Sequence, residues 1–140
     1  MIPPWFADVL WRYARVAIVG GPGTGKTTLA SYATTHPVIH TDDYMGLAWP
    51  DIPRVVMDDL AALGPRWIVE GCQVARCLRK GLHVDVVVVM RVPRRPLTAA
   101  QEGLGKGVMT ILAEVSRAAP ELHFVDPIDY YRQVPTQTNR

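Results

Sequence analysis

The sequence predicts an α/β fold in which helices cover both faces of one parallel sheet of about five strands, giving three layers. Short apolar segments alternate along the chain with segments of helical character. The longest apolar segment, VDVVVVM at 84–90, has the length and β-branching of a strand buried on both faces. Glycine-rich or charged residues follow these segments, where ligands bind in a parallel sheet.

The predicted elements follow one another in regular alternation. After Pro3 and Pro4, apolar residues recur at helical spacing up to Tyr13, so residues 1–14 are predicted to form a helical extension that packs on the sheet. The predicted strands lie at 16–19, 38–40, 67–69, 84–90 and 122–125. The predicted helices between them lie at 26–35, 55–63 and 73–80. This order indicates right-handed crossovers between parallel strands.

The last third of the chain carries fewer signals. Residues 94–119 are predicted to be helical with a glycine-rich break at 103–107, as in a lid that moves over a ligand. Residues 130–140 are predicted to form a loose polar tail. No repeat or linker divides the chain, so 1–140 is predicted to be a single domain.

Composition and charge exclude several classes of protein. The formal net charge of +2 suits anionic ligands but does not by itself indicate a nucleic-acid-binding protein. No apolar segment approaches the roughly 20 residues that cross a membrane. Cys72 and Cys77 lack the spacing of a zinc site and are interpreted as reduced thiols of a cytoplasmic protein. The four histidines show no metal-ligand spacing and are interpreted as structural or surface residues.

The segment from Gly20 to Thr27, GGPGTGKT, matches the pattern G-x-x-x-x-G-K-[ST] between a predicted strand and a predicted helix. Glycines allow the backbone N–H groups to wrap around phosphates, Lys26 would reach the β- and γ-phosphates, and the Thr27 hydroxyl would hold Mg²⁺. The motif predicts a P-loop NTPase-type fold with ATP and Mg²⁺ as ligands. The predicted nucleotide-binding residues are Gly21, Gly23, Thr24, Gly25, Lys26, Thr27 and Thr28.

Such a loop does not determine the reaction. A GTPase would carry a guanine-specifying N-K-x-D motif, which this sequence lacks. The third predicted strand ends in WIVEG, where many ATPases have an aspartate, and the chain is too short for the usual machinery that couples hydrolysis to motion. These observations favour phosphoryl transfer to a small acceptor.

Acidic residues follow the second and third predicted strands. Asp42 is the predicted catalytic base for an acceptor hydroxyl, and Asp43 is predicted to support the acceptor or a Mg²⁺-bound water. The alternative is that one or both cap the following turn. Glu70 is assigned to the acceptor side of the site, with indirect support of Mg²⁺ and an ordinary loop acid as open alternatives.

Arginines and aromatic residues complete the predicted site. Lys26 is expected to act in catalysis together with Arg91, Arg94 and Arg95, which would clamp the transferring phosphoryl oxygens unless they form a solvated cluster. Tyr44 and Trp49 follow the acids and would stack on an acceptor base, or else cover a small core.

The segments GGPGTGKTTLA, PVIHTDDY, WIVEG and VDVVVVMRVPRR together resemble the small P-loop kinases of the adenylate-kinase-like branch. Within it, VIHTDDYMGLAWP and RWIVEGCQVARCLRKG resemble small bacterial and phage kinases labelled topology-modulation proteins. The resemblance spans roughly residues 15–96. It implies a five-stranded parallel sheet with the loop-bearing strand in its middle, and it implies Asp42 as the base. The short interval at 36–66 argues against a phosphorylated acceptor.

We therefore expect an ATP- and Mg²⁺-dependent kinase that transfers the γ-phosphoryl group to a hydroxyl. Some phage kinases of this kind phosphorylate a hydroxymethylated pyrimidine within DNA. The resemblance thus favours a nucleoside or a DNA-borne hydroxymethylpyrimidine, 5-hydroxymethyluracil in phage DNA, as acceptor, so nucleic acid is a candidate partner. The alternatives are a small-metabolite kinase of the gluconate or shikimate type and a nucleotide-binding regulator without an acceptor. Neither the donor base nor the oligomeric state follows from the sequence.

Overall fold

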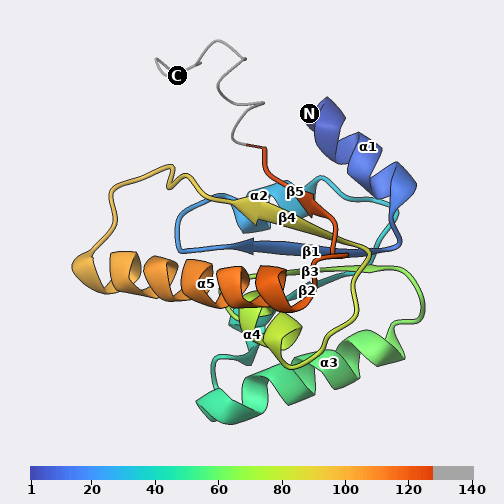
Figure 1. Cartoon of the computed structure of the whole chain (residues 1–140). Helices are drawn as coiled ribbons and strands as arrows, with labels where there is room; N and C mark the ends of the chain where they lie inside the picture. The colour runs from blue at the N-terminus through green and yellow to red at the C-terminus, as the bar shows by residue number, and fades with distance from the viewer. Residues whose placement is uncertain (128–140) are drawn as a thin grey trace.

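Five parallel strands form a single sheet in the order β2-β3-β1-β4-β5, with β1 in the middle (Figure 1). The computed structural model describes residues 1–127, so the predicted tail at 130–140 lies outside the described residues. The strands are β1 (Arg15–Gly20), β2 (Val38–His40), β3 (Trp67–Glu70), β4 (Val86–Met90) and β5 (Phe124–Val125). The predicted α/β class with about five parallel strands is confirmed.

Helices lie on both faces of this sheet (Figure 1). On one face are α1 (Pro4–Arg12) and α2 (Lys26–Ser31), and on the other are α3 (Ile52–Ala62), α4 (Val74–Arg79) and α5 (Ala99–Ala118). Two short 3₁₀ turns, η1 (Thr41–Tyr44) and η2 (Trp49–Asp51), connect β2 to α3. The arrangement is consistent with a three-layer α/β fold.

The alternation of side chains along β1 creates the two cores. Val16 and Ile18 pack with α1 and α2, whereas Ala17 and Val19 pack with α3, α4 and α5. All four side chains are fully buried. A central strand with apolar residues on both faces therefore stabilises both layers, at roughly 25 cal/mol for each Å² of apolar surface removed from water.

The first helix covers the edge of one core. It begins at Pro4, whose fixed φ suits the first turn of a helix, and its buried face carries Phe6, Val9 and Leu10. Phe6 is fully buried. Burial of a phenylalanine side chain contributes about 2–3 kcal/mol, so α1 is anchored to the sheet.

Helix α5 is continuous through 103–107, so the predicted glycine-rich break is wrong. A capping box between Thr98 and Gln101 stabilises its first turn. Further along the helix, the side chains of Val108 and Leu112 are buried in the core. Gly105 lies against the loop after β1, because a Cβ built on Gly21 would lie only 2.7 Å from the Gly105 Cα. Packing thus offsets the low helix propensity of the glycines, one of which permits a close approach.

Some element boundaries also differ from the prediction. The helix predicted at 26–35 ends at Ser31, and α3 begins at Ile52, directly after η2. β4 begins at Val86, two residues later than predicted; just before it, the Asp85 N–H donates to the Arg15 carbonyl at 2.9 Å and the Asp85 carboxylate accepts from the Arg15 N–H at 2.8 Å. Within residues 1–127, no helix has the combined length and apolar character needed to cross a bilayer.

Candidate functional site

The carboxyl ends of the parallel strands bring the predicted site residues to one edge of the sheet. Ile18 of β1 and His40 of β2 both lie opposite Glu70 of β3 in the strand register. Ile68, two residues before Glu70, packs in the core beneath α1 and α2. Because side chains alternate along a strand, Glu70 points to the same face, toward the start of α2.

The loop after β1 has the backbone geometry that its glycines allow. Gly23 and Gly25 have φ angles of 73° and 90°, which side-chain-bearing residues rarely adopt. The Thr24 hydroxyl donates to the Gly21 carbonyl at 2.9 Å, which closes the loop on itself. Gly25 then serves as the N-cap of α2. The loop therefore closes on itself directly before the start of the helix.

Lys26 directs its charge into this loop. The side chain is only 8% exposed, and its Nζ donates to the Gly21 carbonyl at 2.5 Å and to the Thr24 Oγ1 at 3.4 Å. A buried ammonium needs such partners because desolvation disfavours its charge. The structure thus places the Lys26 ammonium inside the loop.

Glu70 joins the loop to β2. Its carboxylate is 1% exposed, and the same oxygen, Oε2, accepts from the Thr27 hydroxyl at 2.9 Å and lies 2.5 Å from the His40 Nδ1. A hydroxyl that gives its hydrogen to a carboxylate keeps both oxygen lone pairs for a cation. Thr27 and Glu70 therefore meet as a candidate magnesium-binding pair.

His40 is a candidate site residue that the sequence pattern did not single out. It carries no spacing signal, and its interpretation as a structural or surface residue left out its contact with Glu70. The sequence feature that could have identified His40 is its position as the last residue of a predicted strand, directly before the TDDY segment. Such strand ends meet at one edge in parallel sheets.

Asp42 and Asp43 lie in the first turn of η1, and both are exposed. Neither carboxylate makes a hydrogen bond or an ion pair with another residue of 1–127, and η1 has no side-chain cap bond. The capping alternative therefore has no contact to support it. Both carboxylates are available to a ligand.

The Cys72 thiol lies near three charged groups of the candidate site. Its pKa is raised chiefly by burial; the Lys26 ammonium opposes this shift, and the carboxylates of Asp42 and Glu70 add to it. The thiol is therefore within electrostatic reach of all three charges. Asp42 therefore acts on the same thiol as the loop lysine and the Glu70 carboxylate.

The three predicted arginines separate into two groups. The Arg94 backbone N–H donates to the Gly23 carbonyl at 2.7 Å. A Cβ built on Gly25 would lie 3.0 Å from the Arg94 Nε, and one on Gly23 would lie 3.4 Å from the Arg95 side chain. Both side chains thus lie against the loop. Arg91 instead forms an ion pair with Asp126, beyond β5.

The two predicted aromatic residues also differ in their surroundings. The Tyr44 hydroxyl donates to Asp59 of α3 at 2.6 Å, and burial, followed by this bond, raises the Tyr44 pKa to about 12. Tyr44 is therefore held by α3. Trp49 is 45% exposed, and the Arg76 guanidinium lies 5.0 Å from the centroid of its ring. Trp49 remains accessible on the surface, against Arg76.

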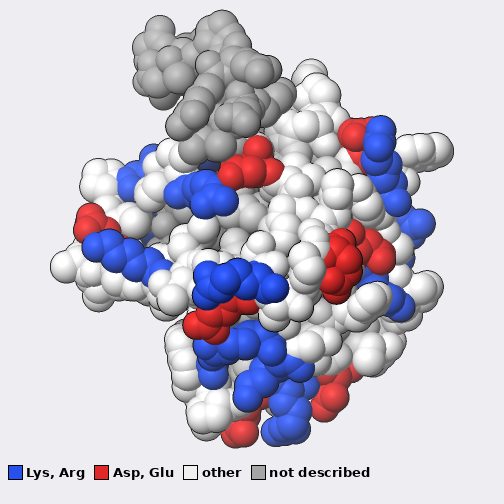
Figure 2. All heavy atoms as spheres, viewed as in Figure 1, with Lys and Arg blue, Asp and Glu red and all other residues white. Residues whose placement is uncertain are grey.

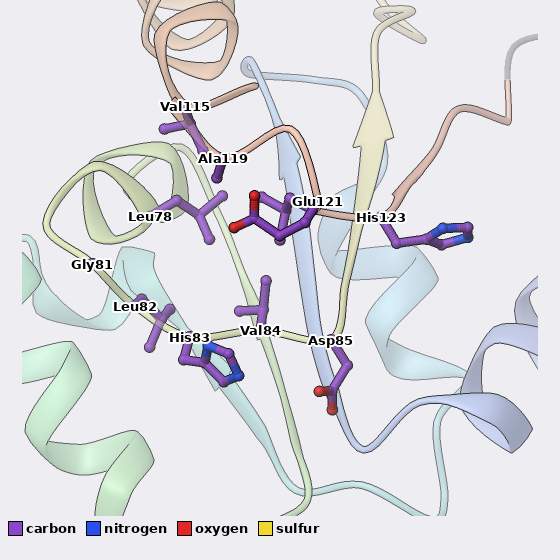
Figure 3. Close-up of a pocket in the computed structure, with 11 residues that line it drawn as sticks. Leu78, Gly81, Leu82, His83, Val84, Asp85, Val115, Ala119, Glu121 and His123 are labelled. Carbon is purple, nitrogen blue, oxygen red and sulfur yellow. The ribbon is translucent and has the colours of Figure 1, made fainter. Parts of the chain in front are cut away.

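A cavity of about 420 Å³ lies away from this cluster, beside residues 81–85, which precede β4 (Figure 3). Apolar side chains such as Leu78, Val84 and Val115 line much of it. Figure 3 shows that Asp85 and His123 point away from Glu121, so the polar lining groups do not converge. We assign the candidate chemistry to the loop at 20–27 and to Glu70, because a reaction requires converging polar groups and these groups contact one another.

No protein-family model matches this chain, and a search of curated proteins finds no match either. Function must therefore be inferred from the site itself. Among the described residues, no three His, Cys, Asp or Glu side chains group as a metal site. Mg²⁺ bound with a nucleotide usually takes only one or two protein ligands, together with water and phosphate oxygens. A hydroxyl with free lone pairs beside a buried carboxylate fits that requirement.

Proposed function

We propose that this protein is an ATP- and Mg²⁺-dependent kinase that transfers the γ-phosphoryl group to a hydroxyl. The observation that carries the proposal is the contact of the Thr27 hydroxyl with the buried Glu70 carboxylate, next to the glycine-rich loop that encloses the Lys26 ammonium. A cation inside a glycine-rich loop, a metal-binding pair and an available carboxylate are the groups that phosphoryl transfer requires.

Each residue has a distinct role in the proposed reaction. The loop at 20–27 holds the phosphates of the donor, and Lys26 balances their negative charge. The Thr27 hydroxyl would ligate Mg²⁺, which supplies further charge neutralisation when bound. Arg94 and Arg95, which lie against the loop, would stabilise charge on the transferring group.

Asp42 acts on the acceptor. Its carboxylate accepts the proton of the acceptor hydroxyl while the hydroxyl oxygen forms a bond to the γ-phosphorus. The bond from that phosphorus to the β–γ bridging oxygen breaks, and ADP leaves. Asp43, the next residue of η1, would position the acceptor.

The proposed acceptor is a nucleoside or a DNA-borne hydroxymethylpyrimidine, such as 5-hydroxymethyluracil. The support is the exposed loop after the acids, in which Met45, Leu47 and Trp49 are 51%, 42% and 45% exposed. An exposed indole is a stacking surface for a base. On the face shown in Figure 2, acidic side chains lie among the basic ones, and the formal net charge of the chain is only +2.

A transfer assay with ATP labelled at the γ-phosphate tests this proposal. Parallel reactions contain free nucleosides, unmodified oligonucleotides, oligonucleotides with 5-hydroxymethyluracil, gluconate or shikimate. Label is expected on a nucleoside or on the hydroxymethylated strand. Label on gluconate or shikimate alone would assign a small-metabolite kinase, and hydrolysis without transfer would assign a nucleotide-binding regulator.

A pair of lysine variants controls the assay. Lys26→Met is expected to abolish transfer because it removes the buried cation of the loop. Lys80→Met removes an exposed lysine just after α4 and is expected to leave transfer unchanged. Equal activity of both variants would contradict the role of the loop.

A further inference from the structure

His40 is joined to the candidate magnesium-binding pair through a single carboxylate oxygen. Its Nδ1 lies 2.5 Å from the Glu70 Oε2, which also accepts the Thr27 hydroxyl at 2.9 Å. The strand register sets this contact, since His40 and Glu70 are direct partners between β2 and β3. Three residues from three segments of the chain thus form one line of hydrogen bonds ending at Thr27.

The chemistry of these groups determines the direction of each bond. An ionised carboxylate only accepts hydrogen bonds, so the Thr27 hydroxyl and the His40 ring must both donate to Glu70. His40 therefore carries its hydrogen on Nδ1, in the neutral ring and in the imidazolium alike. Glu70 is 1% exposed, and burial of a carboxylate is costly unless donors satisfy it.

We propose that His40 is a positioning residue that orients the Glu70 carboxylate, so that Glu70 keeps the lone pairs of the Thr27 hydroxyl directed at the Mg²⁺ of a bound nucleotide. The inference rests on the proposed function. It assigns His40 no contact with substrate: His40 acts through Glu70, and Glu70 acts through Thr27. Without the His40 donor, Glu70 would lose its only described partner other than Thr27 and would be free to turn.

The first test measures how ATP binding depends on Mg²⁺, by calorimetry on the full chain with the metal varied. His40→Leu removes the donor, and we expect it to raise the half-saturating Mg²⁺ concentration about tenfold or more, as outer partners of metal ligands typically do. ATP affinity without metal is expected to stay within about twofold, because His40 does not touch the nucleotide.

The matched variants separate positioning from a structural role. His40→Asn keeps an amide N–H near the place of Nδ1 and is expected to restore the Mg²⁺ dependence to within about threefold of the original. His83→Leu changes an exposed histidine in the loop before β4 and is expected to have no effect. A purely structural role for His40 predicts that His40→Leu weakens ATP binding equally with and without metal.

A second readout needs no nucleotide. Long-range ¹H–¹⁵N spectra of the histidine rings report which nitrogen of His40 carries hydrogen, and we expect Nδ1 to carry it. A neutral ring with hydrogen only on Nε2 would overturn the inference. Unchanged Mg²⁺ dependence in His40→Leu would overturn it as well, while leaving the kinase proposal intact. Failure of the unaltered protein to bind ATP at any Mg²⁺ concentration would overturn the kinase proposal, and the inference with it.

Discussion

The Thr27 hydroxyl donates a 2.9 Å hydrogen bond to the buried carboxylate of Glu70, 43 positions further along the chain. Thr27 lies in the first turn of α2 and Glu70 ends β3, so the bond joins the glycine-rich loop to the neighbouring strand. Since the hydroxyl gives its hydrogen to Glu70, its oxygen lone pairs remain for a cation. This contact is the structural basis of the proposed magnesium site.

Thr27→Ala should weaken Mg²⁺-dependent nucleotide binding because it removes the oxygen ligand. We expect the half-saturating Mg²⁺ concentration to rise about tenfold or more, whereas Thr27→Ser, which keeps the hydroxyl, should stay close to the original protein. Calorimetric titration with ATP and Mg²⁺ measures both. Equal losses in the alanine and serine variants would point to packing of the threonine methyl group and would count against metal ligation.

Asp42→Asn should slow the transfer step and leave nucleotide binding intact. The amide cannot accept the acceptor proton, and loss of a general base typically lowers kcat by about 10²–10⁴-fold. Asp43→Asn should raise the KM of the acceptor more than it lowers kcat, because Asp43 is assigned to positioning. Single-turnover transfer with labelled ATP separates these effects. An unchanged rate in Asp42→Asn would remove Asp42 as the base.

Gly71→Ala should destabilise the fold strongly. Gly71 has a φ of 136°, and a Cβ at this position would lie 1.8 Å from the Thr41 Oγ1, a fully buried atom. Strain and overpacking together should cost about 2–4 kcal/mol of unfolding free energy. Gly81→Ala is the matched control, since Gly81 has a φ of 99° but open space around it, and it should cost about 1 kcal/mol. Urea unfolding measures both, and equal costs would refute the steric explanation.

Tyr44→Phe should reveal a pH-dependent contribution to stability. Burial and the hydrogen bond to Asp59 raise the Tyr44 pKa from 10.0 to about 12. The unfolded chain therefore loses this proton first, so the contribution is complete below pH 10 and is lost as the pH rises toward 12. Below pH 10 the unfolding free energy of the original protein should exceed that of the variant by about 0.5–1 kcal/mol.

Urea unfolding of both proteins from pH 8 upward tests this expectation. The difference in unfolding free energy between them should shrink as the pH rises through the range where Tyr44 ionises. A difference that stays constant with pH would show that the hydroxyl contributes nothing that depends on ionisation. Phenolate absorbance gives an independent measure of the Tyr44 pKa.

Local patterns predicted the fold well where residues carry their own structural preference. The valines of VDVVVVM predicted a buried strand, and Val86–Met90 is β4 with every residue buried. The start of that strand was not predictable, because it depends on pairing with β1, whose Arg15 contacts Asp85 from 70 positions away. The continuity of α5 was missed for the same reason: the glycines weaken its local propensity, and distant packing offsets the loss.

The candidate site was predictable in composition and only partly in arrangement. Positive φ angles at Gly23 and Gly25 follow from the motif itself, since glycine is the residue that adopts them readily. The sequence treated Arg91, Arg94 and Arg95 alike, yet Arg94 and Arg95 lie against the loop while Arg91 pairs with Asp126. Asp126 lies just after β5, far from Arg91 in the sequence. The residues around Arg91 therefore do not indicate which residue it pairs with.

Three features follow from the amino-acid sequence alone: the alternation of strands and helices, the glycine-rich turn, and the types of charged residue at the strand ends. These features depend on side-chain periodicity and on backbone preferences that act over a few residues. The contacts of Glu70 with His40 and with Thr27 instead arise from the folding of the whole chain. Such contacts depend on strand order and register, which the packing of the whole sheet sets.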